Sequence, residues 1–163
     1  MGRLLGECRA FSFVQTMRLL RRWLRQDGKG DSADPSNRIR VRPELSLAFP
    51  GTDVTAVDRL PEEDPVRFLV TVTFLGLYGT SSPLPTFYTE DLLREREDDR
   101  SITRDFLDVV NASLYPLFFQ AWSKYRQHLR LIEEEDPGMR EYLFSLLGLE
   151  SPCIRQRLED PYR

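Results

Sequence analysis

The chain has 163 residues, of which 40% are apolar and 30% charged, and its formal net charge is −3. This composition excludes a disordered chain, and the length suits one domain that buries roughly two thirds of its unfolded surface. The small net charge excludes a strong overall electrostatic attraction to nucleic acid or anionic lipid. No apolar run is long enough for a membrane span. We therefore expect a soluble, cytoplasmic protein.

The first predicted element is an amphipathic helix over residues 11–26. Its apolar residues recur at spacings of three and four, with arginines on the other side: Phe13, Met17, Leu20 and Leu24. The next residues, 27–37, are rich in Gly, Ser, Asp and Pro and predict a flexible linker or loop.

The spacing then changes to two, which predicts β-strands. We expect two short strands around 39–41 and 45–47, joined at a break at Pro43, a third at 54–57, and the strongest at 67–75. A loop rich in Gly and Pro follows at 76–85. It is predicted to hold apolar anchors for a partner protein, namely Leu77, Tyr78, Leu84 and Phe87.

Helices are predicted for the rest of the chain, at 86–95, 101–132 and 139–147. The long aromatic helix has one apolar stripe that includes Val110, Leu114 and Leu117, assigned to the core. Pro116 predicts a kink or a junction of two helices. Aromatics beside the stripe are the predicted second partner-binding face: Tyr115, Phe119 and Trp122.

These elements predict an α+β fold, in which a small antiparallel sheet packs with the N-terminal amphipathic helix and the long aromatic helix. We expect residues 1–163 to form a single domain.

Charge is unevenly distributed along the chain. Residues 90–108 contain eight acids against four arginines, whereas residues 1–30 contain seven basic residues against two acids. Solvated helix faces explain both segments, and a basic helix that meets an acidic partner surface is the alternative.

No motif for catalysis emerges. His128 is the one histidine, the loop with Ser81 and Ser82 lacks the nucleophile and phosphate-binding patterns, and Cys8 and Cys153 lack metal-site spacing. We expect no enzyme activity, no cofactor and no metal.

Four blocks of sequence together carry a resemblance to a known family. They are FSFVQTMRLLRRW, RIRVRPELSLAFPGTDVTAV, VTVTFLGLYGTSSPLPTFYTE and FLDVVNASLYPLFFQAWSKYR. With the four blocks in this order, the chain resembles the TssG family, also called ImpH or VasB, of the bacterial type VI secretion baseplate. Two positions depart from the family pattern: residues 79–85 lack a proline and a glycine, and Ala112-Ser113 replaces His-Arg.

The resemblance implies a structural baseplate protein that joins TssF into a wedge, contacts TssK and lies near TssE, at the inner face of the inner membrane. It implies no nucleic-acid partner, no membrane insertion and no small-molecule substrate. Family members are longer, so the chain looks like an amino-terminal half, with 133–163 as the start of the other half. The alternative is a stand-alone adaptor or regulatory protein derived from a truncated baseplate gene.

Overall fold

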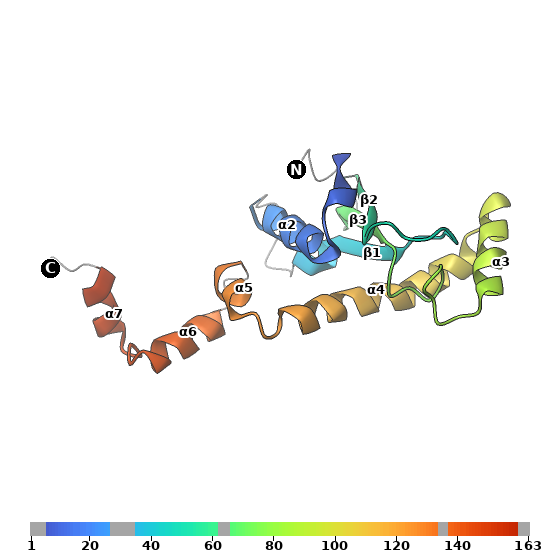
Figure 1. The fold of residues 1–163 in the computed structure, drawn as a ribbon. Helices are drawn as coiled ribbons and strands as arrows, with labels where there is room; N and C mark the ends of the chain where they lie inside the picture. Colours follow the sequence, from blue (N-terminus) through green and yellow to red (C-terminus); the bar gives the residue numbers. More distant parts are fainter. Residues whose placement is uncertain (1–5, 27–34, 62–65, 134–136, 160–163) are drawn as a thin grey trace. The chain divides into compact units, whose positions relative to one another are not determined.

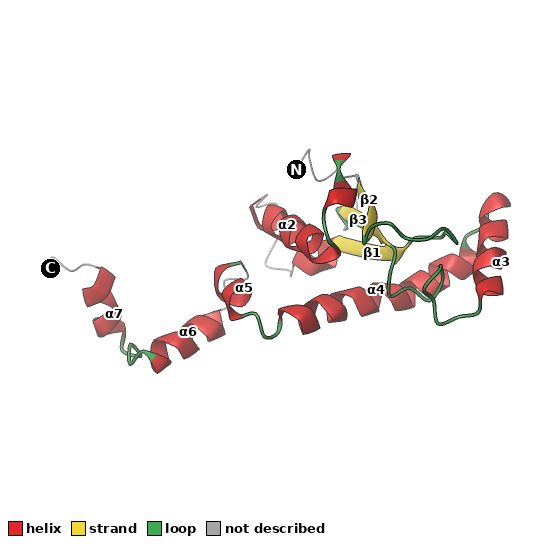
Figure 2. Ribbon diagram, in the orientation of Figure 1, coloured by secondary structure: helices red, strands yellow, loops and turns green. Residues whose placement is uncertain are grey.

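The structure is a computed structural model that describes residues 6–26, 35–61, 66–133 and 137–159. It divides into two compact units, Met1–Phe119 and Gln120–Arg163. The first unit contains a three-stranded sheet with helices, and the second is helical (Figures 1 and 2). Most of the predicted linker at 27–37 lies outside the described residues, and its end forms a short 3-10 helix, η2 (Pro35–Arg38).

The sheet is mixed, with strand order β1-β3-β2. Strand β3 (Phe68–Val72) lies in the middle, parallel to β1 (Ile39–Pro43) and antiparallel to β2 (Val54–Arg59). The α+β class is therefore confirmed, but the expectation of an antiparallel sheet is wrong. Because the two outer strands run in opposite directions, the central strand must be parallel to one of them.

Residues 45–47 do not form the predicted strand. Strand β1 ends at Pro43, which has no backbone N–H to continue a ladder. Leu45 is nevertheless buried, in a small cluster with Tyr78 and Leu92. The apolar spacing at 45–47 therefore reflects burial of a loop residue rather than strand pairing.

Helix α2 (Phe13–Gln26) confirms the predicted amphipathic helix, which begins two residues later than expected. Its buried side joins all three strands in the main core. The members from α2 are Phe13, Met17, Leu20 and Leu24. A short 3-10 helix, η1 (Cys8–Ala10), precedes α2.

Helices α3 (Thr86–Glu97) and α4 (Ile102–Ser123) follow the loop after β3. The helix predicted at 101–132 ends at Ser123, and a separate helix, α5 (Gln127–Ile132), follows. Pro116 lies inside α4, so the alternative of two helices that meet there is wrong. Tyr115 and Phe119 of α4 belong to the main core.

The second unit contains α5, α6 (Pro137–Leu146) and α7 (Pro152–Glu159), the last of which was not predicted. Helix α6 ends as expected near Gly148, whose φ of 72° is the left-handed conformation that ends many helices. Arg155 then fixes the corner between α6 and α7, with two hydrogen bonds to the Glu141 carboxylate at 2.8 and 2.7 Å. Over the described residues, no helix has the length and apolar character needed to cross a membrane.

Candidate interaction surface

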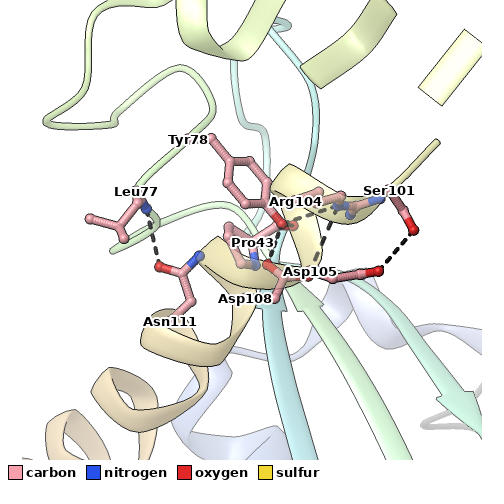
Figure 3. A network of polar contacts seen from close by, with 8 residues as sticks. All are labelled: Pro43, Leu77, Tyr78, Ser101, Arg104, Asp105, Asp108 and Asn111. Atoms are coloured by element: carbon pink, nitrogen blue, oxygen red, sulfur yellow. Dashed lines mark hydrogen bonds and ion pairs between the residues drawn. The ribbon is translucent and has the colours of Figure 1, made fainter. Parts of the chain in front are cut away.

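The loop after β3 is attached to α4 by a polar network around Tyr78 (Figure 3). The Tyr78 ring is buried, and its hydroxyl lies 2.6 Å from Asp108 Oδ1 and 3.2 Å from the carbonyl oxygen of Pro43. Arg104 Nε donates to the same hydroxyl at 3.2 Å and lies 4.0 Å from Asp108 Oδ2. Burial raises the pKa of Tyr78, and the protonated hydroxyl donates a hydrogen bond to the Asp108 carboxylate.

Further contacts hold the backbone of this loop in place. The Leu77 N–H donates to Asn111 Oδ1 at 3.2 Å, and the Tyr115 hydroxyl donates to the carbonyl oxygen of Phe74 at 2.8 Å. Gly79 has φ of 105°, a conformation that favours glycine, and its N–H donates to Thr89 of α3. The loop is therefore shaped by contacts within the unit.

The structure separates the predicted partner-binding residues into three groups by exposure. Tyr78, Tyr115 and Phe119 are buried. Leu77, Leu84 and Trp122 are half-buried. The centroid of the Trp122 ring lies 3.7 Å from the guanidinium of Arg126, and both of these residues belong to the second unit. Phe87 is exposed and stacks on Tyr88. Partner contacts at these seven residues stay a prediction, but the rings of the buried three already pack inside the unit.

Helix α4 exposes part of the apolar stripe that was assigned to the core, and it buries Tyr115 and Phe119 of the adjoining face. The buried face holds Asn111, Tyr115 and Phe119, whereas Val110 and Leu117, which were assigned to the core, are exposed. The opposite face is an exposed apolar set that we call the outer row: Ile102 (82% exposed), Phe106 (71%), Val109 (70%), Val110 (44%) and Leu117 (59%).

A hollow beside the loop, lined by Pro43, Tyr78 and Gly79 among others, has a volume of about 10 Å³, which is room for one water. No group of three or more His, Cys, Asp or Glu among the described residues could hold a metal ion.

A comparison with protein-family models gives a match that covers nearly the whole chain. The family described as "Type VI secretion, TssG" matches residues 7–163. The chain belongs to the TssG family. No curated protein and no solved structure matched it.

Membership of TssG confirms the resemblance found in the sequence, and it implies a component of the type VI secretion baseplate. The family is structural rather than catalytic.

In this TssG chain, sequence reasoning missed the outer row as an exposed surface. Apolar residues go almost all the way round α4, so periodicity alone could not select the buried face. The signal that could have selected it is polar. Asp108 and Asn111 lie within a helical turn of each other, and both make hydrogen bonds to the loop that packs on α4.

Proposed function

We propose that this TssG-family chain scaffolds the baseplate wedge of the type VI secretion system by binding TssF and TssK, with TssE and other baseplate proteins as further neighbours. It acts in the cytoplasm, at the inner face of the bacterial inner membrane. No reaction, cofactor, nucleic acid or membrane insertion is part of this role.

The observation that carries this proposal is the outer row of α4. Apolar patches that stay exposed on a folded unit commonly mark protein interfaces. Four members of the row are more than half exposed, although the same helix contributes two aromatic residues to the core. An assembly protein whose neighbours cover this face accounts for both observations.

The test is co-expression of the chain with TssF from the same bacterium, followed by size-exclusion chromatography. The double variant Phe106→Ser/Leu117→Ser is expected to lose TssF while it keeps the unfolding midpoint of the parent. The matched control, Leu19→Ser/Phe49→Ser, removes two exposed apolar residues that lie outside α4 and should retain TssF. Equal retention of TssF by both variants would contradict a role for the outer row.

A second arm addresses TssK and the loop. The variant Leu84→Ser/Phe87→Ser changes a half-buried residue of the loop and an exposed residue in the first turn of α3, so folding should be little affected. We expect weaker binding to immobilised TssK and unchanged binding to TssF. Unchanged binding to TssK would remove the loop from the proposal.

A further inference from the structure

The outer row lies on a helix whose charged residues are confined to its first two turns. Between Asp108 and Lys124 the sequence contains no charged residue. A helix that is apolar on all sides is normally buried on all sides. The inner face of α4 meets this requirement through Tyr115 and Phe119, whereas the outer row does not. We therefore expect an element from outside the unit to pack on the outer row.

The spacing of the row indicates what kind of element covers it. Ile102, Phe106 and Val109 follow one another at steps of four and three, and Leu117 continues the line beyond the small, exposed Ser113. This is the spacing at which side chains of one helix fit between those of another. A partner strand, with its period of two, would match few of these positions.

Resting on the proposed function above, we propose that the outer row binds an antiparallel α-helix of a partner subunit. That helix carries aliphatic residues at steps of three and four, and it carries Lys or Arg near its C-terminal end. The small side chain of Ser113 allows close approach of the two helices at the middle of the contact.

Charge at one end of the row supports both the basic residues and the antiparallel orientation. The exposed Asp105 flanks the row in the first turn of α4, and α3 adjoins this end, where Thr103 donates to Glu95 at 2.7 Å (Figure 1). Residues 90–108 carry eight acids against four arginines. Basic side chains are favoured near helix C-termini, so an antiparallel partner brings its basic end to this acidic one.

A second copy of the chain fits less well than a different subunit. In a parallel pair, the acidic ends of the two α4 helices would meet and repel each other. In an antiparallel pair, Asp105 and Asp108 would lie opposite residues within 109–123 of the other copy, which carry no charge, and the first basic residue, Lys124, follows the end of α4. A second copy therefore supplies less basic charge to the acidic end than a helix with Lys or Arg along its C-terminal turn.

Photo-cross-linking in the complex of the full chain with TssF tests the proposal. Val109→p-benzoylphenylalanine and Leu117→p-benzoylphenylalanine place probes eight residues apart on one face of α4, with Leu19→p-benzoylphenylalanine as the control outside it. We expect both α4 probes to link to one helix of TssF, at sites two helical turns apart and in reversed chain order. The control should give no link to that helix.

Charge reversal gives a second readout that does not depend on packing. Asp105→Lys is expected to lower the affinity for TssF about threefold at low salt, an effect that shrinks at high salt. Asp58→Lys, at an exposed position on β2, should leave the affinity unchanged.

The outcomes separate the helix inference from the proposed function. Loss of TssF co-elution with the parent chain would overturn the proposed function, and the inference with it. Co-elution with cross-links to a strand or loop of TssF, to a second copy of this chain, to a helix in the same chain order, or to nothing would overturn the inference alone.

Discussion

The two faces of α4 differ both in composition and in environment. The inner face is buried and mixes aromatic rings with polar groups, and the Tyr115 hydroxyl and the Asn111 amide both bond to the loop. The outer row is purely apolar and exposed. The difference teaches that polar groups with partners identify the face that a protein buries within itself, whereas an apolar face without them is available to another chain.

Truncation of the inner face should have the largest effect. Tyr115 is fully buried in the main core, where its ring lies near those of Phe13 and Phe74. Tyr115→Ala should lower the free energy of unfolding by about 3–5 kcal/mol, because it leaves a cavity and an unpaired carbonyl. Urea denaturation followed by circular dichroism measures this loss. A loss below about 1 kcal/mol would show that the inner face is not core.

Removal of one hydroxyl at the loop should have an intermediate effect. Tyr78→Phe keeps the buried ring but leaves Asp108 and Arg104 without their shared partner. We expect the free energy of unfolding to fall by about 1–3 kcal/mol. Tyr88→Phe, on an exposed ring, is the matched control and should be neutral. If the two variants had equal stability, the network would not attach the loop to α4.

The inner face should also make stability depend on pH at the alkaline end. Burial raises the pKa of Tyr78 and of Tyr115 above the ordinary value of 10. Above about pH 10 the unfolded chain loses these protons while the folded chain retains them, so stability falls as pH rises further. Urea midpoints at pH 9 and pH 11 should differ, and the difference should shrink in Tyr115→Phe. If the difference between the two urea midpoints were unchanged in Tyr115→Phe, Tyr115 would not contribute to the pH dependence of stability.

A change in the outer row should have the smallest effect on folding. Leu117→Ala removes a side chain that is 59% exposed, so we expect the free energy of unfolding to change by no more than about 0.5 kcal/mol. The same urea denaturation measures it beside Tyr115→Ala. A loss near that of Tyr115→Ala would mean that the outer row is covered within the free chain.

Local pattern was enough to predict α2, α3 and the positions of β2 and β3. The apolar spacing of three and four in α2, and of two in β3, corresponds to faces that are buried, whereas in β2 a bulge places the buried Val54 and Val57 three residues apart. The direction of β1 relative to β3 could not be predicted, because pairing depends on contacts between residues distant in sequence. The break at Lys124 was hidden as well, since the apolar spacing of α4 continues into α5.

The sequence predicted where the candidate site lies better than it predicted which residues form it. The sequence pointed to the loop and to the aromatic helix, but it proposed Tyr78, Tyr115 and Phe119 as anchors for partners. Aromatic rings look the same in a sequence whether they fill a core or an interface. Tyr78 and Tyr115 are buried and hydrogen-bonded within the unit, contacts that become visible only in three dimensions, and their partner contacts stay a prediction.

Chemical accessibility of the outer row, free and in complex, tests the central claim most directly. Leu117→Cys in a Cys153→Ser background leaves buried Cys8 as the other cysteine, so alkylation by iodoacetamide reports on position 117. We predict fast alkylation of the free chain and a rate at least about tenfold lower in the complex with TssF, whereas Leu19→Cys in the same background reacts equally in both. Equal rates at position 117 with and without bound TssF would contradict the account.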